Sequence, residues 1–567
     1  MRDLGVYADV LPSETPASEL IGRKGVIISG GPGSVYDPES PQLHRSLLQS
    51  EYPVLGICYG QQLMAHVLGG EVRKGELGEY GFAQLEIQAE GMIFRGIEKY
   101  QQVWMSHRDQ VASLPQGYAT IARTATCEIA AIASVERKHF AVQFHPEVAH
   151  TPSGSRILSN FVFDVCGCKK DWDPRGQVAA IEEQIRETAR GRSVFFFVSG
   201  GVDSTVAYTL CLKALGPEKV HGRYVDTGLM REGETEFVRS NFAALLGDKP
   251  GATSFAVEDA SDLFLGSLAK AIEPEDKRNI IGEAFVQVQQ RILDSDGYLN
   301  GNWVLGQGTI YPDTIESGGT AKADLIKTHH NRVAGIQKLM DEGRIIEPLS
   351  SFYKDEVRAV GRELGLSDEL LNRHPFPGPG LAIRCLCTNE EDAPDRAMGG
   401  WILPVRSVGV QGDSRTYRAA LALREFPANP EEIARLVNSS EGFNRVVVAL
   451  WSDRSMATLH SIPSRLTAER LARLRKADAI VRRISKESGF DSQIWQFPVV
   501  SIPIGTESKP DSIVLRPIDS VDGMTANAVT MPESLMNRLV EELKNVEGVA
   551  AIFYDLTNKP PGTIEWE

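Results

Sequence analysis

The segment at residues 193–198 (SVFFFV) limits the fold of this chain most narrowly, because it is almost entirely apolar and leads directly into SGGVDS at residues 199–204. A helical pattern continues over residues 204–216, and a further strand-like run follows at residues 220–225. Strands that are apolar on both faces are typical of parallel sheets that helices cover. The alternation therefore predicts an α/β domain, which we place at residues 177–384.

The amino-terminal part of the chain shows the same alternation. Residues 25–29 (GVIIS) and 53–57 (PVLGI) are apolar runs bounded by Gly and Pro, and residues 140–144 (FAVQF) form another strand-like run. The first two runs are each followed by a turn and a helical pattern. We therefore expect a separate α/β domain at residues 1–168, which the polar stretch at residues 171–176 (DWDPRG) joins to the next domain.

Beyond residue 400 the pattern changes. Strand-like runs lie at residues 403–410 and 512–518, and helical patterns lie at residues 467–487 and 532–545. We assign residues 400–567 to a third domain of α+β type. The two strand-like runs have loosely similar surroundings, which leaves a duplicated unit open.

Charge and cysteine content bear on the partners of the chain. A net charge of −15 disfavours duplex DNA and anionic membranes, since both would repel an acidic surface. No apolar run approaches the roughly 20 residues that cross a bilayer. The seven cysteines are an odd, scattered set that does not predict a disulfide framework. The pairs Cys166/Cys168 and Cys385/Cys387 lack the spacing of a zinc site. The sequence thus predicts a cytosolic protein that binds neither nucleic acid nor membrane.

A cysteine stands between two glycines at the end of the apolar run at residues 53–57. Gly56 and Gly60 flank Cys58, and a helical pattern follows at residues 61–68. Small flanking residues permit the sharp strand-to-helix turn that exposes a nucleophile, and a helix N-terminus favours a thiolate. The pattern predicts a nucleophilic Cys58, while a structural cysteine beside a tight turn is the other interpretation.

Two further segments supply what a thiol nucleophile needs. His145 follows the run at residues 140–144, and Glu147 comes two residues later. A thiol requires a base to take its proton and a third group to orient that base. The segment SGGPGS at residues 29–34 also follows a strand-like run, so its backbone N–H groups can face a developing oxyanion. Because all these segments end strands of one α/β domain, we expect them to meet.

Together these segments resemble the class I glutamine amidotransferase family. The resemblance implies that Cys58 is the nucleophile, His145 the general base and acid, and Glu147 the orienting group. It also implies a set of residues that hold the oxyanion and glutamine: Gly30, Gly31, Gln62, Ser106 and His107.

The chain departs from the family pattern at two places. Arg108 stands where the family usually has glycine, which would reshape the loop near glutamine. The chain begins at Met1 with MRDLGVY, which looks like the end of the first helix and the second strand of the family. A central amino-terminal strand is therefore expected to be missing.

The segment SGGVDS presents successive backbone N–H groups and a helix N-terminus to an anion. It is not a Walker A loop, because no Gly-Lys-Ser/Thr follows. It resembles the PP-loop of the N-type ATP pyrophosphatases, which have a doubly wound fold like that of the adenine-nucleotide α-hydrolases and cleave ATP between the α- and β-phosphates. The resemblance implies that ATP is held by this loop and by the turn after the next strand: Ser199, Gly200, Gly201, Val202, Asp203, Ser204, Val225, Asp226 and Gly228.

Several later segments resemble the GMP synthetase family, and the resemblance covers nearly the whole chain. They lie at residues 308–317, 326–331, 374–384 (HPFPGPGLAIR), 408–413 and 559–567 (KPPGTIEWE). The resemblance implies that XMP is aminated through an adenyl-XMP intermediate. Ammonia from glutamine would displace AMP, and Mg²⁺ is expected on the phosphates of the co-substrate ATP.

The same resemblance implies two further groups of residues. XMP would be held by Arg278, Gly378, Pro379, Gly380, Asp413, Gln496, Lys559, Ile564 and Glu565. A lid that closes over the nucleotides would contain Asp313, Glu316, Lys327, His329 and His330. The two adjacent histidines do not predict a metal site, because adjacent side chains point apart in most backbones.

The expected protein is thus an α/β multidomain enzyme: an amidotransferase α/β domain, a doubly wound PP-loop domain, and an α+β carboxyl-terminal domain of the type that mediates dimerisation. Its small-molecule substrates would be glutamine, XMP and ATP, and the chain would be a homodimer or a monomer. A tRNA-modifying PP-loop ligase, a glutaminase-impaired synthetase that depends on ammonia, and a nucleotide-binding paralogue remain alternatives. The acidic charge and the carboxyl-terminal KPPGTIEWE segment argue against the tRNA-modifying alternative.

Overall fold

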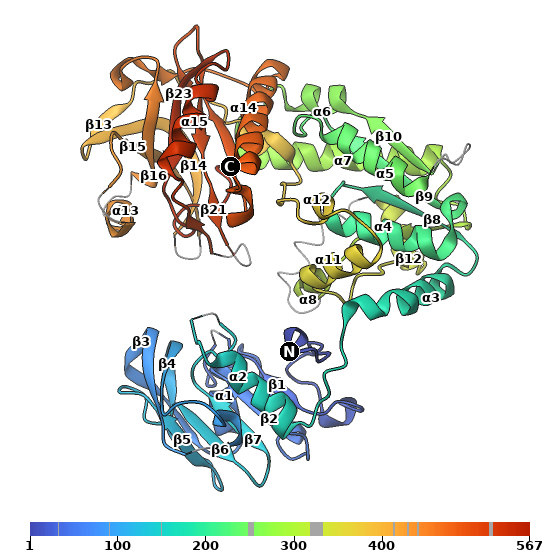
Figure 1. Cartoon of the computed structure of the whole chain (residues 1–567), viewed down its shortest axis with the longest axis vertical. Coiled ribbons are helices and arrows are strands. Elements are labelled where there is room, and N and C mark those ends of the chain that lie inside the picture. Colours follow the sequence, from blue (N-terminus) through green and yellow to red (C-terminus); the bar gives the residue numbers. More distant parts are fainter. Residues whose placement is uncertain are drawn as a thin grey trace. The chain divides into compact units, whose positions relative to one another are not determined.

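The computed structural model describes residues 1–31, 33–89, 91–148, 150–247, 254–317, 333–411, 414–427, 430–438, 442–520 and 525–567. These residues form two compact units, Met1–Asp173 and Pro174–Glu567 (Figure 1). None of the helices in these ranges is both long enough and apolar enough to span a bilayer.

The first unit is built on a seven-stranded sheet with the order β1-β2-β7-β6-β5-β3-β4. Its strands are β1 (Val26–Ile28), β2 (Val54–Ile57), β3 (Glu71–Ile87), β4 (Tyr100–Ser113), β5 (Ala119–Arg123), β6 (Ala131–Ser134) and β7 (His139–Val142). β1, β2 and β7 are parallel, and the other neighbours are antiparallel. β2 and β7 are buried along their whole length, as their apolar runs predict. The helices are α1 (Tyr59–Val67) and α2 (Gly154–Ser159).

The amino-terminal segment, residues 1–7, was expected to contain the end of a helix and a strand, and the strand is not found there. Within the described residues no strand precedes β1, and short 3₁₀ helices occupy Arg2–Leu4 and Ala17–Glu19. The backbone carbonyl of Gly5 accepts from the N–H of Trp172 at 2.9 Å instead of joining a sheet ladder. The Tyr7 ring lies 4.8 Å from that of Trp172. These contacts, which a local pattern does not reveal, hold the segment as a loop.

The second unit opens with a five-stranded, all-parallel sheet of order β10-β9-β8-β11-β12. The strands are β8 (Ser193–Val198), β9 (Val220–Asp226), β10 (Phe255–Asp259), β11 (Trp303–Gly306) and β12 (Ile345–Ile346). The helices are α3 (Val178–Ala189), α4 (Val202–Leu215), α5 (Glu234–Leu246), α6 (Ser261–Leu268), α7 (Pro274–Ser295), α8 (Tyr311–Ser317), α10 (Ala334–Asp341), α11 (Lys354–Glu363) and α12 (Asp368–Leu371). Strand order reverses at β8, and ligands bind at such a switch point, beyond the carboxyl ends of the strands.

The same unit contains a second, mixed sheet of order β13-β14-β15-β16-β23-β20-β18. Its strands are β13 (Asp395–Ala397), β14 (Gly400–Gln411), β15 (Ser414–Leu423), β16 (Phe443–Ser452), β18 (Val499–Ile502), β20 (Asp511–Leu515) and β23 (Val549–Asp555). Two small two-stranded sheets consist of β17 (His460–Ser461) with β19 (Ile504–Gly505), and β21 (Ile518–Asp519) with β22 (Asn527–Ala528). Helices α13 (Pro430–Asn438), α14 (Ala468–Glu487) and α15 (Glu533–Leu543) accompany them (Figure 1).

The two larger sheets of this unit share a hydrophobic core. One buried cluster contains Phe195 and Val225 of the parallel sheet, Leu474 of α14 and Ile552 of β23. The helices predicted at residues 467–487 and 532–545 are confirmed as α14 and α15. The runs at residues 403–410 and 512–518 lie in β14 and in β20 with β21. β14 and β20 are strands of one sheet, separated by β15, β16 and β23.

Candidate active sites

Cys58 occupies a strained backbone position between β2 and α1. Its φ is 52° and its ψ is −108°, and it directly precedes the first residue of α1. Positive φ is uncommon for a residue with a side chain and is characteristic of functional turns. A Cβ on Gly60 would lie 2.2 Å from the carbonyl oxygen of Ile28, and one on Gly56 would lie 2.7 Å from Sδ of Met64. The flanking glycines are therefore required by packing, as the sequence pattern predicts.

His145 and Glu147 lie beside this turn as a hydrogen-bonded pair. Nδ1 of His145 lies 2.7 Å from Oε1 of Glu147. Hydrogen bonds to Cys58 and to Glu147 raise the pKa of His145 to about 10, although burial acts in the opposite direction. The site therefore favours an imidazolium that faces the sulfur of Cys58. The structure brings together the three residues that the sequence singles out for nucleophilic catalysis.

Gln143 is a site residue that the sequence interpretation missed. Its side chain is fully buried, and its Nε2 lies 3.6 Å from Sγ of Cys58. Its Oε1 accepts from Nε2 of Gln62 at 3.2 Å, and Gln62 also donates to the carbonyl of Asp109 at 2.7 Å. The signal was a polar residue within the apolar run that leads to His145. Gln62, predicted to hold glutamine, is thereby hydrogen-bonded to the residue that contacts Cys58.

The other residues predicted around glutamine lie close to Cys58. A Cβ on Gly30 would lie 3.2 Å from Cε1 of His145 and 3.3 Å from Cβ of Cys58, so the segment predicted to bind the oxyanion passes directly beside both side chains. At Gly31 a Cβ would meet Tyr59 at 3.8 Å. The carbonyl of Ser106 lies 3.8 Å from Sγ of Cys58.

His107 and Arg108, which follow Ser106 in β4, point in different directions. The imidazole of His107 is buried and lies 3.3 Å from Oε2 of Glu79 and 3.1 Å from the carbonyl of Asp109. Arg108 is exposed. The imidazole of His107 is therefore engaged within the β3–β4 hairpin.

The second site begins at the loop between β8 and α4, at the switch point of the parallel sheet. Gly200 has a φ of 74°, and a Cβ there would lie 2.5 Å from Val238. Ser199 Oγ accepts from the N–H of Gly201 at 3.2 Å, and Ser204 Oγ donates to the carbonyl of Gly201 at 3.1 Å. The loop thus closes on itself ahead of the N-terminus of α4, in the geometry that binds anions.

Two basic residues that the sequence interpretation missed flank this loop. Nζ of Lys354, the first residue of α11, lies 2.7 and 2.6 Å from the two carboxylate oxygens of Asp203. Arg373 donates to the carbonyl of Gly200 at 3.4 Å and to both carboxylate oxygens of Glu234 at 2.7 and 2.6 Å. Two basic side chains, each paired with a carboxylate, therefore lie beside the predicted phosphate-binding loop.

The turn after β9 holds Asp226 by two internal hydrogen bonds. Oδ1 of Asp226 accepts from the N–H of Gly228 at 2.9 Å, and Oδ2 accepts from Thr235 at 2.6 Å. Val225 is buried at the end of β9. This turn and the PP-loop end adjacent strands, because β8 and β9 pair in parallel. The predicted ATP-binding residues are thereby brought to one edge of the sheet.

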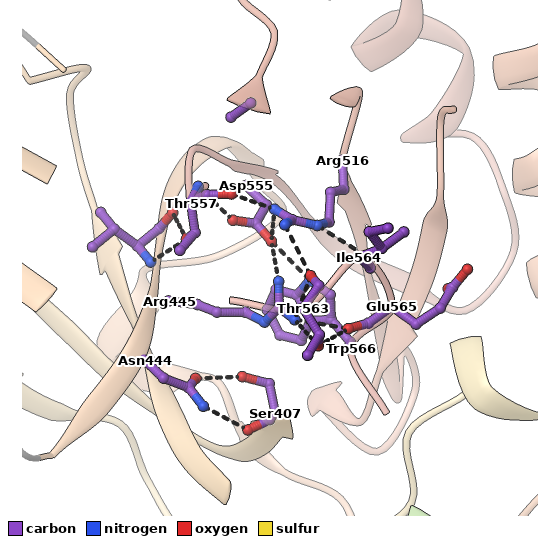
Figure 2. A network of polar contacts seen from close by, with 12 residues as sticks. Ser407, Asn444, Arg445, Arg516, Asp555, Thr557, Thr563, Ile564, Glu565 and Trp566 are labelled. Atoms are coloured by element: carbon purple, nitrogen blue, oxygen red, sulfur yellow. Dashed lines mark hydrogen bonds and ion pairs between the residues drawn. The ribbon is translucent and has the colours of Figure 1, made fainter. Parts of the chain in front are cut away.

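The carboxyl-terminal segment is held by a buried network (Figure 2). Arg445 and Arg516 both pair with Oδ2 of Asp555, at 3.0 and 2.9 Å. Their guanidinium groups also donate to the carbonyls of Thr563, Ile564 and Glu565 at 2.8 to 3.0 Å. Burial and the neighbouring Arg516 lower the pKa of Arg445 to about 9, although Asp555 acts in the opposite direction.

Trp566 completes this network. Its indole Nε1 donates to Oδ2 of Asp555 at 2.9 Å, and its side chain is fully buried. Burial favours the neutral form of Asp555, but Arg516 and Arg445 hold the pKa of this carboxyl below its ordinary value. Ile564 and Glu565, both predicted to bind XMP, therefore stand on a fixed backbone.

Other predicted XMP residues meet at this segment and at the HPFPGPG loop. Arg278 of α7 donates to the backbone carbonyl of Glu567 at 2.6 Å. Gln496 donates to the carbonyl of Pro375 in the loop at 2.6 Å. The backbone of Lys559 exchanges hydrogen bonds of 2.7 and 3.0 Å with that of Ala526.

The HPFPGPG loop itself packs against the turn after β9. Gly380 has a φ of 65°, and a Cβ there would lie 2.4 Å from the carbonyl oxygen of Leu229. Pro379 directly precedes Gly380, and Gly378 is exposed. The last residue of the loop therefore lies directly against the turn after β9.

Some of the residues predicted to form the lid and to bind XMP are not among the described residues. Asp413, Lys327, His329 and His330 lie outside the described residues. Asp313 lies in the first turn of α8, and its Oδ2 accepts from the backbone N–H of Ile310, the residue before the helix, at 3.0 Å. Glu316 lies in α8. Among the described residues no group of three or more His, Cys, Asp and Glu side chains forms a metal-binding cluster.

Three parts of the chain match known protein families. Residues 1–165 match the family description "Glutamine amidotransferase class-I", residues 175–279 match "NAD synthase", and residues 483–566 match "GMP synthase C terminal domain". A protein of Leptospira interrogans described as a probable glutamine-hydrolyzing GMP synthase is 41% identical over 588 residues, covering 100% of this chain and 96% of the relative. The glutamine-hydrolyzing GMP synthase of Thermomicrobium roseum is 39% identical, covering 100% of this chain and 93% of the relative. The glutamine-hydrolyzing GMP synthase of Aquifex aeolicus is 36% identical, and the match covers 100% of this chain and 96% of the relative.

Proposed function

This chain belongs to the family of glutamine-hydrolysing GMP synthases, and we propose that the residues described above divide its reaction into a glutaminase and an ATP-dependent amination. The chain is a ligase that takes its nitrogen from glutamine and converts XMP to GMP. One observation carries the assignment of residues: a strained Cys58 faced by the His145–Glu147 pair and a PP-loop at a sheet switch point occur in the same chain.

The glutaminase step begins at Cys58. Its sulfur attacks the amide carbon of glutamine, and backbone N–H groups of Gly30 and Gly31 stabilise the oxyanion. His145, held by Glu147, gives its proton to the nitrogen as the carbon–nitrogen bond breaks, and ammonia leaves. Water then hydrolyses the thioester to glutamate, with His145 accepting a proton from the water. Gln62 and Gln143 position the amide of glutamine next to the sulfur.

The amination consumes ATP at the PP-loop. The oxygen on C2 of XMP attacks the α-phosphorus of ATP, and the bond from that phosphorus to the oxygen of the β-phosphate breaks. Backbone N–H groups of residues 199–204, Lys354 and Arg373 bind the departing pyrophosphate. Ammonia then adds to C2, and AMP leaves with the former C2 oxygen. The excess protons of ammonia pass to solvent.

Magnesium fits this site as an ion that arrives with ATP. Mg²⁺ is bound through one or two carboxylates with phosphate oxygens and water. Asp203 presents a partly exposed carboxylate in the PP-loop, two residues after Gly201. Bound there, the ion would neutralise charge that develops on the leaving pyrophosphate. Asp203 and Lys354 together would then orient the β-phosphate.

XMP would bind where the HPFPGPG loop meets the carboxyl-terminal segment. Arg278 and Lys559 supply positive charge for its phosphate, and Glu565 supplies an acceptor for the purine. Gly378, Pro379 and Gly380 let the backbone approach the nucleotide closely. Gln496 supports this loop through its hydrogen bond to the carbonyl of Pro375.

The setting of the enzyme belongs to the same proposal. We place the reaction in the cytosol, with small-molecule substrates and with neither nucleic acid nor membrane as partner. The chain acts as a homodimer or a monomer, and sedimentation of the purified protein distinguishes the two. Asp313, Glu316, Lys327, His329 and His330 are proposed to form the lid over the nucleotides.

The proposal is tested by product analysis with the full-length protein. We expect XMP, ATP and Mg²⁺ to give GMP, AMP and pyrophosphate in equal amounts with either ammonia or glutamine as donor, and glutamate in equal amount with glutamine. Nucleotides are separated by chromatography, and glutamate is measured enzymatically. Formation of AMP without GMP, or no consumption of XMP with either donor, would refute the proposed amination.

A further inference from the structure

The turn after β9 is held from outside the parallel sheet at three successive carbonyls. The carbonyl of Leu229 accepts from the N–H of Leu381 at 2.7 Å. The carbonyls of Gly228 and Met230, on either side of it, both accept from the guanidinium of Arg475 on α14, the second at 2.8 Å through Nε. The side chain of Arg475, on a helix far along the chain, therefore donates to two of the three carbonyls.

The turn needs this support because its own shape is unusual. Gly228 has a φ of 69°, and a Cβ there would lie 2.7 Å from Ser261. Asp226 accepts hydrogen bonds from Gly228 in the turn and from Thr235 in α5, and the N–H of Leu229 donates to Thr227 Oγ1 at 3.2 Å, so these bonds leave the carbonyls of residues 228 to 230 unengaged. These carbonyls are engaged by Arg475 of α14 and by Leu381.

A buried ion pair adds a second link between the turn and α14. Nε of Arg231, the last residue of the turn, lies 3.5 Å from Oδ2 of Asp478, and the side chains are 6% and 1% exposed. Neither carboxylate oxygen of Asp478 has a hydrogen-bond partner among the described residues. The Arg231 guanidinium also lies 4.4 Å from the centre of the Phe376 ring in the HPFPGPG loop. Asp478 is thus the charge that balances Arg231 in a buried setting.

Helix α14 is a rigid base for these contacts. Arg475 and Asp478 are three residues apart and lie on one face of the helix. Leu471, Leu474 and Val481 of the same helix belong to the buried cluster that also holds Val225 and Leu229. The helix is therefore packed against the turn as well as bonded to it.

We propose that Arg475 and Asp478 are positioning residues for ATP, which act by holding the turn at residues 226–231 in the shape that binds the nucleotide. The inference rests on the proposed role of Asp226 and Gly228 in the ATP site. Neither Arg475 nor Asp478 needs to touch ATP. Removal of either side chain should loosen the turn and weaken ATP binding, while XMP binding and glutamine hydrolysis change little.

The test compares Arg475→Met with Arg483→Met in the full-length protein. Both variants remove a guanidinium from α14, but that of Arg483 is half exposed and pairs with Glu487 and Glu542 at the surface. The primary measurement is equilibrium binding of Mg-ATP by calorimetry, which does not depend on turnover. The loss of two charged hydrogen bonds to the turn predicts a Kd for ATP about tenfold or more higher in Arg475→Met, and an unchanged Kd in Arg483→Met.

Two further variants keep the inference falsifiable if Arg475→Met does not fold. Arg475→Lys retains one donor and should bind ATP with intermediate affinity. Asp478→Asn removes the charge that balances Arg231 and should also raise the Kd for ATP, whereas Glu487→Gln on the same helix should not. Steady-state assays with ammonia should show a raised KM for ATP and an unchanged KM for XMP.

The outcomes separate this inference from the proposed function. Equal ATP affinities in the Arg475 and Arg483 variants would overturn the positioning role, as would a wild-type protein that does not bind ATP. If the wild type binds ATP and loses that affinity in Arg475→Met, yet makes no GMP, the inference stands and the proposed amination fails. A lower melting temperature with normal ATP binding would show that Arg475 is merely structural.

Discussion

Arg384 donates to both carboxylate oxygens of Glu565, from Nε at 2.8 Å and from Nη2 at 2.7 Å. The arginine is fully buried and lies in the segment that follows the HPFPGPG loop, whereas Glu565 belongs to the carboxyl-terminal segment. This bidentate ion pair orients the carboxylate of Glu565, which we propose binds XMP. It joins two segments that the sequence interpretation treated separately.

Arg384→Lys should weaken XMP binding. Lysine cannot reproduce the paired donors of a guanidinium, so Glu565 loses its fixed orientation. We expect the KM for XMP to rise about tenfold with the KM for ATP nearly unchanged, measured with ammonia as donor. Arg362→Lys, which alters an exposed ion pair with Asp368, is the matched control. Equal effects of the two substitutions would remove Arg384 from the XMP site.

Gly60→Ala should damage the glutaminase unit. The added Cβ would lie 2.2 Å from the carbonyl oxygen of Ile28, and neither backbone can move without disturbing Cys58. Overpacking of this kind typically costs about 1–3 kcal/mol. We expect glutamine-dependent activity to fall more than tenfold while ammonia-dependent activity persists. Gly91→Ala, where a Cβ would meet Ile121 at 3.8 Å, should leave both activities intact.

His145 should remain protonated well above pH 6.5, the ordinary value for histidine. Contacts with Cys58 and Glu147 raise its pKa to about 10. Because the folded-state pKa is raised, the stability from this proton is fully present below pH 6.5 and is lost as the pH rises through about 10. Glu147→Gln should shift the titration to lower pH, as measured by NMR of labelled histidine.

His139 provides the internal control for that titration. Burial lowers the pKa of His139 to about 4, so its resonance should not change between neutral and alkaline pH in either protein. A titration of His145 that is the same in wild type and Glu147→Gln would contradict the assigned pairing.

The turn at Cys58, the glycine-rich loops and most elements of the fold could be predicted, because their signals are local. The spacing of Gly56, Cys58 and Gly60 encodes a turn directly, and Ser193–Val198 is confirmed as β8. The same local reasoning failed at Tyr7, where a contact with Trp172 replaces the expected strand. A partner that lies far along the chain has no local signature.

The supporting charges could not be predicted for the same reason. Lys354 and Asp203 are 151 residues apart, and Arg373 and Gly200 are 173 apart. Read alone, such residues resemble the solvated charges of any surface. Arg445 and Arg516 are fully buried against Asp555, a placement that depends on the packing of β16, β20 and β23. Tertiary structure, not residue type, makes them part of the site.

Gly308→Ala should impair the synthetase unit selectively. A Cβ at Gly308 would lie 2.7 Å from the backbone nitrogen of Ser204 in the PP-loop. The displaced loop should bind ATP less well, so GMP formation should fall with ammonia as well as with glutamine. Hydrolysis of glutamine alone, measured as glutamate, should persist. Gly301→Ala, where a Cβ would meet nothing within 4 Å, should retain all activities, and an equal loss there would argue against the contact.

The division of labour between the two units is tested most directly by Cys58→Ala. GMP formation from XMP and Mg-ATP is measured with glutamine and then with ammonia, in wild type and variant. The account predicts that wild type uses both donors and that Cys58→Ala uses ammonia at the wild-type rate but does not use glutamine. A variant that still uses glutamine, or a wild type that requires ammonia, would contradict the assignment of Cys58 as the nucleophile of a working glutaminase.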